Sequence, residues 1–381
     1  MIKIGTVFSG IGAVEFALKR LNVEHNIVFA CDNGEREIEY DVETLKQKVF
    51  SLSTIDEKQK FVESLYKEKT GKQNYVQKSY FTNYPQLNTN RYFQDVVLLD
   101  GTDFAGQVDL FVGGSPCQSF SMVGSQAGLD DVRGTLFYEY ARLIKEIQPK
   151  VFIYENVRNL LTHDNGNTWK TIKKIFDSLN YEYKFAILNA SDYGIPQSRR
   201  RLFVVGFKKE LNIKFNFPPQ TKPLKYVMKD FCENNCAFGN MTFDSRGEII
   251  LADKAGDVDD KYLLTPLVYK YVMSEGTKSW HSKVKINLDV ARTLLKTMGN
   301  RHRAGVDNYV SFDGTEKLGS VRMLTEREAH RLMGFTDDYK IVVSTAQAYK
   351  QAGNSIVVDV LMEILKEIFK TGVFGNIENE L

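Results

Sequence analysis

Short apolar runs alternate with amphipathic stretches over the first 206 residues of the chain. The apolar runs are rich in β-branched and aromatic residues and have the length of buried strands. Between them, apolar residues recur at helical spacing, as at Val14, Ala17 and Leu21. The pattern predicts strands at residues 2–8, 27–31, 96–99, 108–112, 151–154 and 202–207, and helices at residues 13–21, 136–147 and 168–179.

This alternation of strands and helices predicts an α/β fold with a doubly wound, mostly parallel sheet. In such sheets, ligands bind beyond the carboxyl ends of the strands. Several polar motifs of this chain directly follow predicted strands. We therefore expect the functional residues to meet at one edge of the sheet.

Two segments interrupt the alternation. Residues 35–72 are highly charged and predict one or two solvated helices inserted into the sheet, with the insertion reaching to about residue 78. Residues 208–320 show little periodicity and predict a separate small domain of short strands and loops. The chain then returns to the first domain (1–207) through residues 321–381. There we expect a helix at residues 325–333, with a capping box between Thr325 and Glu328, and a closing helix at residues 355–369.

Composition and charge narrow the class of protein. The 381 residues are 43% hydrophobic and carry a net charge of +2. That value is a cancellation, because residues 197–320 have a net charge of +7 and the remainder −5. Four cysteines make no disulfide framework, and Cys232 and Cys236 lack a second pair of metal ligands, so no metal is expected. Without a leader or a membrane-length apolar run, we expect a protein of the reducing cytosol with no membrane partner.

The first strand is followed by a glycine-rich turn, Phe8-Ser9-Gly10-Ile11-Gly12. Glycines there let the backbone approach a ligand at a helix N-terminus, although many such turns use glycine for geometry alone. Asp32 ends the second predicted strand, where a carboxylate can bind ribose hydroxyls. Asp103 follows the third and could accept a hydrogen bond from an adenine amino group. Together these residues favour an adenosine-type ligand over ordinary turn residues.

Three further motifs contain residues that are suited to covalent and acid–base chemistry. Cys117 follows Pro116 just beyond a predicted strand, which favours a reactive thiolate over a buried, inert cysteine. Glu155 emerges from an apolar strand and is either a desolvated proton donor or a salt-bridged carboxylate. Arg199 and Arg201 would share one face of a strand and point toward the site, whereas Arg200 would face solvent.

These motifs, in this order, resemble those of the DNA cytosine-5 methyltransferases, and specifically the bacterial restriction-modification type. FSGIG is similar to the family's cofactor loop, GGSPCQSFS to its nucleophile loop, YENV to its glutamate motif and QSRRR to its double-arginine motif. RMLTEREAHRLMGF and QAGNSIVVDVL resemble the last two motifs. The similarity spans nearly the whole chain except residues 35–72 and the basic segment.

The resemblance implies transfer of a methyl group from S-adenosylmethionine to carbon-5 of a cytosine flipped out of duplex DNA, leaving S-adenosylhomocysteine. Cys117 would attack carbon-6 of the base, and Glu155 would hydrogen-bond or protonate ring nitrogen 3. After methyl transfer, loss of the carbon-5 proton and elimination of Cys117 would restore the double bond of the ring. By the same resemblance, Arg199 and Arg201 would hold the base oxygen and a nearby phosphate. Asn156 would fix the geometry at the strand end. Ser121 would contact the target phosphate or the water that removes the proton.

The resemblance also implies a cofactor pocket in a Rossmann-like methyltransferase domain. It would be lined by Phe8, Gly10, Gly12, Asp32, Asp103, Phe104, Pro116, Leu136, Asn354 and Ser355. One departure concerns the second-strand acid, which the family usually follows with a large side chain that packs on adenine. Here the pair is Asp32-Asn33, so cofactor affinity is weaker or Phe104 supplies the adenine contact.

By the same resemblance, residues 208–320 are a target-recognition domain for double-stranded DNA. Its basic residues would contact phosphates, and a few side chains would read base edges. We expect Gln118, Thr293, Arg301 and Arg303 at the DNA, with a phosphate role open for both arginines.

Two alternatives remain beside this interpretation. A tRNA cytosine-5 methyltransferase shares the motifs but has a shorter variable region and usually a Cys-Phe-Thr element, which this sequence lacks. A catalytically inactive DNA-binding homologue should have lost Cys117 or Glu155, and both are present. We expect a monomer of the prokaryotic cytosol, with a cognate restriction endonuclease acting separately.

Overall fold

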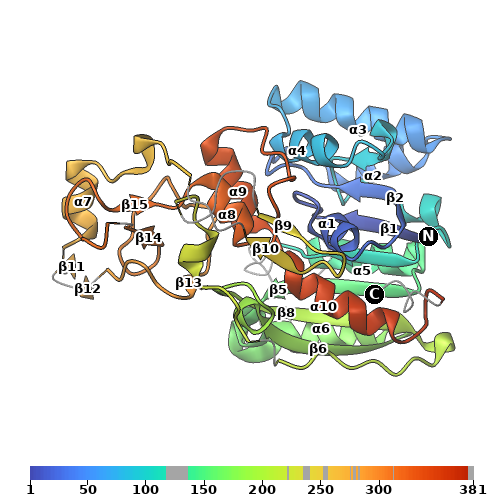
Figure 1. Ribbon diagram of the computed structural model, residues 1–381. Coiled ribbons are helices and arrows are strands. Elements are labelled where there is room, and N and C mark those ends of the chain that lie inside the picture. Colours follow the sequence, from blue (N-terminus) through green and yellow to red (C-terminus); the bar gives the residue numbers. More distant parts are fainter. Residues whose placement is uncertain are drawn as a thin grey trace.

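The computed structural model describes residues 1–116, 136–220, 223–234, 241–251, 256–274, 276–277, 280–281, 284–311 and 313–375. A large lobe holds the central sheet, and a smaller lobe extends from it (Figure 1). The sheet has the strand order β3-β2-β1-β4-β5-β8-β6. Its strands are β1 (Ile2–Val7), β2 (His25–Cys31), β3 (Tyr92–Phe93), β4 (Leu110–Gly113), β5 (Val151–Val157), β6 (Tyr181–Asn189) and β8 (Arg200–Lys208).

The strands β1 to β5 pair in parallel, whereas β8 is antiparallel to both β5 and β6. The prediction of a doubly wound, mostly parallel sheet is therefore confirmed. Because β8 runs against β5, the start of β8 lies at the same edge of the sheet as the end of β5. This reversal brings the arginine motif to the glutamate motif.

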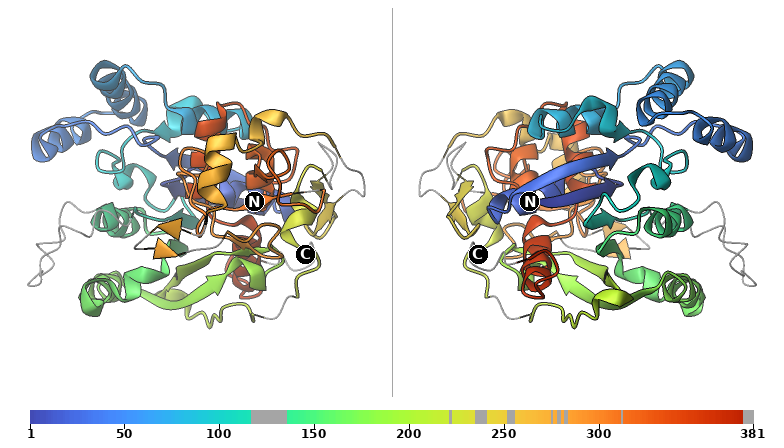
Figure 2. Two further views of the ribbon diagram at one scale, coloured as in Figure 1. Left: turned by 90° about the vertical axis from the view of Figure 1, so that its left-hand side faces the viewer. Right: turned by 90° about the vertical axis from the view of Figure 1, so that its right-hand side faces the viewer.

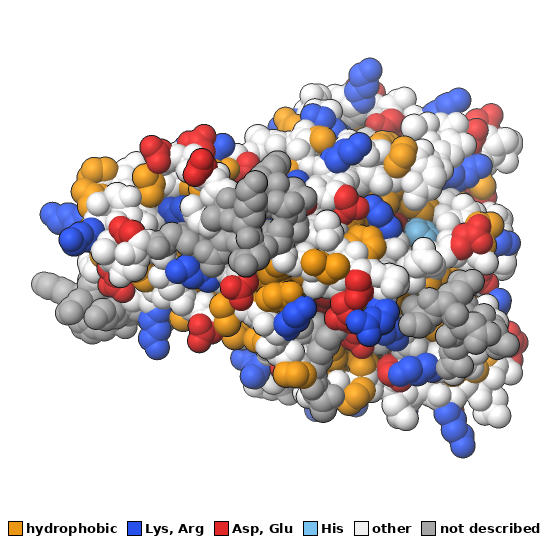
Figure 3. Space-filling model, viewed as in Figure 1, with side chains coloured by type: hydrophobic (Ala, Val, Ile, Leu, Met, Phe, Trp, Pro, Cys, Tyr) orange, Lys and Arg blue, Asp and Glu red, His pale blue; other side chains and the backbone are white. Residues whose placement is uncertain are grey.

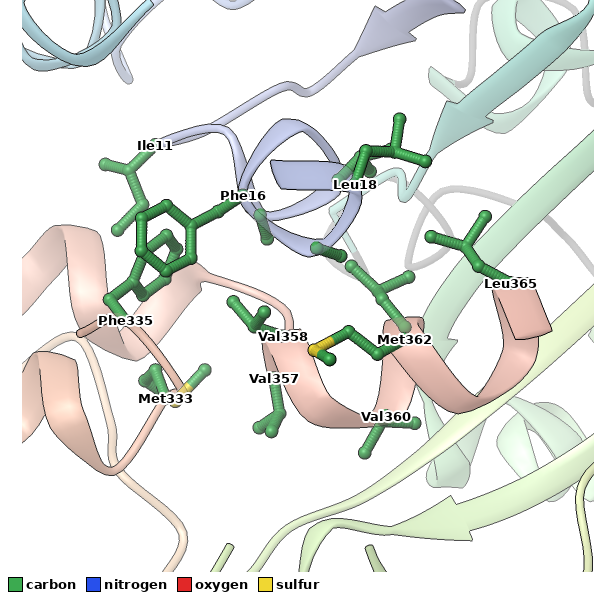
Figure 4. Packing of buried hydrophobic residues seen from close by; sticks show 14 of the residues in the cluster. Ile11, Phe16, Leu18, Met333, Phe335, Val357, Val358, Val360, Met362 and Leu365 are labelled. Carbon is green, nitrogen blue, oxygen red and sulfur yellow. The ribbon is translucent and has the colours of Figure 1, made fainter. Parts of the chain in front are cut away.

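Helices cover both faces of the sheet. On one face, α1 (Ala13–Arg20) packs against α10 (Val358–Phe369), with Phe16 and Met362 among the buried side chains between them (Figure 4). On the other face, α5 (Leu136–Ile147) and α6 (Asn167–Asp177) share a separate hydrophobic cluster with β4 and β5. The C-terminal segment thus completes the core that the first helix begins. The apolar face of α10 is therefore buried in the core of the large lobe.

The predicted strand at residues 96–99 is wrong. The Asp95 Oδ1 atom accepts a hydrogen bond from the Val97 amide, which bends the chain. The Arg142 guanidinium then donates to the carbonyls of Val96 and Leu99. These backbone groups are satisfied by side chains, so the apolar run needs no neighbouring strand. The third strand is instead β3, and the acid that follows it is Asp95.

Two further elements were not expected from the sequence. The strand β6 lies at the sheet edge and has exposed Phe185 and Ile187, so its pattern of apolar residues does not mark one buried face. The helix α9 (Thr345–Asn354) is short and mostly polar in sequence. By contrast, the predicted capping box is confirmed, because Thr325 and Glu328 exchange hydrogen bonds at the start of α8 (Glu326–Arg331).

The charged insertion forms α2 (Val42–Phe50) and α3 (Ile55–Thr70), followed by α4 (Tyr75–Asn83). The prediction of one or two helices at residues 35–72 is confirmed. Figure 2 shows α2 and α3 projecting from one corner of the large lobe. They are not wholly solvated, however, because Val49, Val62 and Tyr66 form a small buried cluster with Leu98, which follows β3.

The smaller lobe has its own core of Leu264, Val272, Val284, Tyr309 and Val321. Residues from the first part of the 208–320 segment, including Phe215, Phe231 and Met241, instead join the core of the large lobe. The remaining elements are β7 (Gln197–Ser198), β9 (Met241–Phe243), β10 (Ile249–Leu251), α7 (Pro266–Val272), β11 (Gly276–Thr277), β12 (Trp280–His281), β13 (Ala291–Arg292), β14 (Tyr309–Val310) and β15 (Arg322–Met323).

Candidate active site

The segment that leads to the predicted nucleophile is fixed at the end of β4. A Cβ atom on Gly114 would lie 2.8 Å from the Glu155 carbonyl oxygen and 3.0 Å from its Oε2 atom, so only glycine fits there. The buried Ser115 hydroxyl lies 2.8 Å from the Tyr154 hydroxyl. Asn156 donates through Nδ2 to the Ser115 carbonyl at 2.9 Å. Asn156 therefore links the end of β5 to the segment that follows β4.

The nucleophile itself falls in residues 117–135, outside the described residues. The predicted roles of Cys117, Gln118 and Ser121 rest on the sequence alone. What the structure does describe is the exposed Pro116, at the end of a segment anchored to β5.

Glu155 and Arg201 form the centre of this edge. The Arg201 Nε atom lies 3.1 Å from Glu155 Oε1, and the two side chains are only 16% and 14% exposed. The antiparallel pairing of β5 with β8 sets this contact, because Glu155 lies opposite Phe203, two positions along from Arg201. Both residues therefore face the same side of the sheet.

Burial raises the pKa of Glu155 above its ordinary value, although the charges of Arg201 and Arg199 act in the opposite direction. A carboxyl group with a raised pKa keeps its proton closer to neutral pH and can donate it. The same guanidinium contact stabilises the carboxylate after the proton has left. Glu155 is thus suited to giving a proton to, or sharing one with, a ring nitrogen.

Arg199 differs from Arg201, which the sequence did not predict. It precedes β8, is buried, and donates to the carbonyls of Leu294 (2.9 Å), Gly353 (3.0 Å) and Ser355 (2.7 Å). The expectation that both arginines lie on one strand face is therefore wrong. Arg199 Nε is buried and has no hydrogen-bond partner within the described part of the chain, so its N–H group remains available. Arg200 is exposed, as expected.

The glycine-rich turn after β1 adopts a left-handed backbone. The φ angles of Gly10 and Gly12 are +54° and +77°, and Phe8 has a φ of +53°. A Cβ atom on Gly12 would lie 2.1 Å from the Tyr84 ring, whose hydroxyl donates to the Gly12 carbonyl at 2.6 Å. A Cβ atom on Gly10 would meet only the Phe8 carbonyl oxygen, at 3.9 Å, among the described residues, so the loop has open space on that side.

Asp32 joins the ends of β1 and β2. Its Oδ2 atom accepts from the Gly10 amide at 2.9 Å, and its Oδ1 atom accepts from the Gly34 amide at 2.8 Å. Burial raises the pKa of Asp32, and these two amides lower it. A buried carboxylate beside an open glycine loop suits the hydroxyl groups of a ribose. These residues therefore fit a nucleoside group at this edge.

The acid at the end of β3 is Asp95, which the sequence analysis missed. Asp103 instead lies in a short 3₁₀ helix, and its carboxylate accepts from Lys58 Nζ at 2.9 Å. Phe104 is 1% exposed and packs on Phe29 at a ring-centroid distance of 4.5 Å, so it offers no free face for an adenine contact. Recognising the Tyr92-Phe93 pair as the third strand would have identified Asp95.

The other predicted cofactor residues surround the same edge. Leu136 begins α5 and is half-buried against the core. Asn354 ends α9, is exposed, and donates to Glu35 Oε1 at 2.8 Å. Ser355 is buried, and its carbonyl is one of the acceptors of Arg199. The final motif is thus linked both to the segment after Asp32 and to the arginine motif.

Residues of the predicted recognition domain reach the large lobe directly. β13 pairs in parallel with β7, and Thr293 Oγ1 donates to the Ser198 carbonyl at 2.5 Å. Arg301 is exposed, whereas Arg303 donates to Asp307 and to Thr297 Oγ1. On the face shown in Figure 3, basic and acidic side chains are interspersed over the described surface of both lobes.

Among the described residues, no three or more His, Cys, Asp or Glu side chains lie close enough together to hold a metal ion. Within the same ranges, no helix combines the length and apolar character that crossing a bilayer requires.

A mostly parallel sheet with a glycine turn after β1 and an acid after β2 defines a Rossmann-like fold, the fold of the methyltransferases in the solved structures below. Comparison of structures agrees: a Dnmt2 methyltransferase from S. pombe is similar with a TM-score of 0.64 and 16% identity, over 97% of this chain and 99% of that one. A putative DNA modification methyltransferase from an E. coli prophage gives a TM-score of 0.62 at 21% identity, over 97% and 99% of the two chains.

Sequence comparison then defines the family. The family model of the C-5 cytosine-specific DNA methylases matches residues 2–370, and the chain belongs to this family. Type II methyltransferase M.HhaI of Haemophilus parahaemolyticus is 35% identical over 68% of this chain and 75% of its own length. Type II methyltransferase M.SsoII of Shigella sonnei is 34% identical over 78% and 72%. The protein is a DNA cytosine-5 methyltransferase, and the covalent cysteine mechanism and the use of S-adenosylmethionine are general to this family.

Proposed function

We propose that this chain is the modification methylase of a type II restriction-modification system and methylates cytosine within one short duplex sequence. The observation that carries the proposal is the buried Glu155–Arg201 pair beside a segment that Gly114 and Asn156 hold in place. That arrangement serves a base that must be activated covalently before it can accept a methyl group. The similarity to type II methyltransferases supports the biological setting.

In this proposal Cys117 forms a bond from its sulfur to carbon-6 of the flipped cytosine, while Glu155 gives a proton to ring nitrogen 3. Arg201 holds the base oxygen and keeps Glu155 in position. Once carbon-5 carries the methyl group, its proton leaves to a water that Ser121 orients, the sulfur–carbon bond breaks, and the proton on ring nitrogen 3 returns to Glu155. Arg199 contributes through its Nε–H donor and by linking the arginine motif to the final motif.

The cofactor would be held at the ends of β1, β2 and β3. S-adenosylmethionine supplies the methyl group when it is bound. The loop from Phe8 to Gly12 would lie against it, Asp32 would bind the ribose hydroxyls, and Asp95 would take the role first assigned to Asp103, accepting from the adenine amino group. The remaining lining residues would be Pro116, Leu136, Asn354 and Ser355.

We propose the smaller lobe as the part that recognises the DNA sequence. Thr293 lies beside the start of β8 and would contact the strand next to the flipped base, together with Gln118. Arg301 is exposed and would contact a phosphate or a guanine. Arg303 would first have to give up its bonds to Asp307, so a direct base contact is less favourable there. The enzyme would act as a monomer in the prokaryotic cytosol, with a cognate endonuclease as a separate protein.

The test is methylation of a mixed-sequence plasmid by the purified protein, followed by base-resolution mapping of 5-methylcytosine. We expect full methylation at one short motif. The same protein should form a covalent complex with a duplex that carries 5-fluorocytosine at that motif, because fluorine cannot leave as the proton does. Cys117→Ser should abolish both results and leave DNA binding nearly intact.

Cys236→Ser is the control, because it removes a thiol outside the nucleophile motif. It should retain methylation and the covalent complex. Turnover by Cys117→Ser would contradict the nucleophile assignment. Methylation of tRNA but not of the plasmid would contradict the DNA substrate.

A further inference from the structure

The inserted segment brings two tyrosine hydroxyl groups within hydrogen-bonding distance of Asp95, the acid after β3. Tyr40, just before α2, donates to Asp95 Oδ2 at 2.7 Å, and Tyr66 of α3 donates to the same atom at 2.8 Å. The Val97 amide donates to Asp95 Oδ1 at 2.9 Å. With three donors around it, the carboxylate has one orientation. Asp95 is 8% exposed and Tyr66 is 2% exposed, so water competes little for these bonds.

A second set of contacts joins the insertion to the same edge. Asn74, at the start of α4, donates to the Asp32 carbonyl and to Gln94 Oε1, each at 2.8 Å. Lys58 of α3 donates to Asp100 at 2.6 Å and to Asp103 at 2.9 Å. The segment thus reaches the chain after β2 and after β3. Ion pairing compensates the charge of Asp103, whereas Asp95 accepts from neutral hydroxyls and an amide.

Asp95 and Asp32 lie together at the ligand edge. Burial raises the pKa of the Cys31 thiol, and the charges of Asp95 and Asp32 raise it further, which places both carboxylates near the last residue of β2. A second lone pair of Asp95 Oδ1 can still accept a hydrogen bond, because a carboxylate has about four acceptor positions. Docking two helices would need only apolar contacts such as Val49 and Val62. Packing of these helices does not require two hydroxyl groups that donate to the same carboxylate oxygen.

We propose that Tyr40 and Tyr66 are positioning residues of the cofactor site, which hold Asp95 for the amino group of the adenine of S-adenosylmethionine. The inserted helices α2 and α3 are then a working part of the methyltransferase domain. The inference rests on the proposed cofactor role of Asp95. It assigns to this insertion the task of selecting an adenine over a purine that has no amino group at position 6.

The experiment measures binding of two ligands to the full chain by calorimetry. One is S-adenosylhomocysteine, and the other is S-inosylhomocysteine, in which an oxygen replaces the amino group. We expect the wild-type protein to prefer the first. Tyr40→Phe and Tyr66→Phe should each reduce this preference, and the double variant should reduce it by about tenfold, the equivalent of one hydrogen bond to a charged group.

Tyr183→Phe is the matched control. Its hydroxyl also donates to a carboxylate, Asp177 Oδ1, at 2.8 Å, but from β6 at the far edge of the sheet. It should leave the preference unchanged. A tyrosine variant that weakens both ligands equally, or lowers only the midpoint of thermal unfolding, would show a purely structural role and overturn the inference.

Asp95→Ala separates this inference from the proposal on which it rests, because alanine has no acceptor atom. If Asp95→Ala leaves the preference unchanged, the cofactor role of Asp95 is wrong. If Asp95→Ala removes the preference but neither tyrosine variant alters it, the role of Asp95 stands and the positioning role of the insertion is overturned. Each substitution removes or exchanges few atoms, and single variants can be compared if the double variant does not fold.

Discussion

Glu155 combines two opposing influences at one carboxyl group. Burial in the strand raises its pKa, and the guanidinium groups of Arg201 and Arg199 lower it. From the sequence alone, Glu155 could be either a proton donor or a salt-bridged carboxylate. The structure contains the salt bridge and the raised pKa together, so the two interpretations are not exclusive. The pH dependence of the enzyme should report this balance.

The first prediction concerns Glu155→Gln. Glutamine keeps the shape of the side chain but cannot transfer a proton, so kcat should fall by about 10²- to 10⁴-fold. Because the raised pKa keeps the acid protonated to higher pH, wild-type activity should decline only as the pH rises through that value. The variant should lose this alkaline decline. Single-turnover methylation between pH 5 and 9 measures both effects, and an unchanged rate would contradict the role of Glu155.

The second prediction concerns Arg201→Met, with the exposed Arg200→Met as its control. Removing the charge beside Glu155 removes an influence that lowers its pKa, so that pKa should rise further. The alkaline decline of activity should then move to higher pH, and kcat should fall because a contact to the base is lost. Arg200→Met should change neither. A decline that stays at the wild-type pH would show that Arg201 does not act on Glu155.

At the residue scale, the position of a side chain at a strand end was predicted wherever the apolar run before it was located correctly. Glu155, Asn156 and Asp32 lie where the apolar run before each of them ends. The prediction failed for Asp103, because the strand before it was misplaced by a few residues. It also missed the difference between Arg199 and Arg201. That difference depends on carbonyl groups of Leu294 and Gly353, which are far away in the sequence.

At the scale of elements, the end of α9 is packed against the chain from the smaller lobe. A Cβ atom on Gly353 would lie 2.3 Å from the Lys296 amide nitrogen and 2.4 Å from the Leu295 carbonyl carbon. Both are backbone atoms, which cannot rotate away as a side chain can. The last residue but one of α9 is therefore glycine, because another segment of backbone approaches it closely.

The third prediction is that Gly353→Ala destabilises the protein by about 1–3 kcal/mol, the usual cost of overpacking. Alanine favours a helix over glycine by about 1 kcal/mol, so a loss of stability must come from the contact with Lys296. Urea unfolding of the variant measures the change. Gly106→Ala, where the structure describes no atom within 4 Å of a Cβ, is a control for the substitution alone, with the cost of its positive φ. Equal or greater stability of Gly353→Ala would contradict the close packing.

Elements with one strongly buried face were predicted well, and α5 begins and ends at the predicted residues. The edge strand β6 and the polar helix α9 were missed, because their stability comes from neighbours rather than from their own hydrophobic pattern. The insertion was predicted as helical and solvated. Its helices are present, but Lys58, Tyr66 and Asn74 are engaged with the sheet edge.

At the scale of the whole molecule, residues 208–320 are shared between the two lobes, whereas the sequence predicts that they form one separate domain. Residues such as Phe231 and Met241 are part of the large core, and the separate small core begins near Leu264. A chimera should therefore exchange residues 256–320 and leave residues 208–251 in place.

The fourth prediction is that this exchange, with the corresponding segment of another DNA cytosine-5 methyltransferase, changes the methylated sequence. Thr293 and Leu294 should be kept, because they bond to Ser198 and Arg199. The same plasmid mapping identifies the new motif. An unchanged motif in an active chimera would mean that sequence is read elsewhere in the molecule.

The fifth prediction concerns charge. DNA affinity should fall steeply with salt, because each phosphate contact releases counterions. Arg301→Ala should reduce the slope of log Kd against log salt by about 1, as expected for one lost phosphate contact. Arg303→Ala should instead lower thermal stability, because it leaves Asp307 without its partner. Fluorescence anisotropy at several salt concentrations measures the slopes, and a flat response would exclude the basic segment as the DNA surface.

The sequence by itself determined the family, the order of the strands and helices, and the chemistry of the main motifs, because each of these depends on residues that are close together in the chain. Only the tertiary structure decided which distant groups meet. The reversal of β8 brings Arg201 to Glu155, the bend after Asp95 replaces a predicted strand, and α3 brings Tyr66 to that carboxylate. Such contacts depend on the path of the backbone between elements. Hydrophobic periodicity fixes the faces of those elements but not their partners.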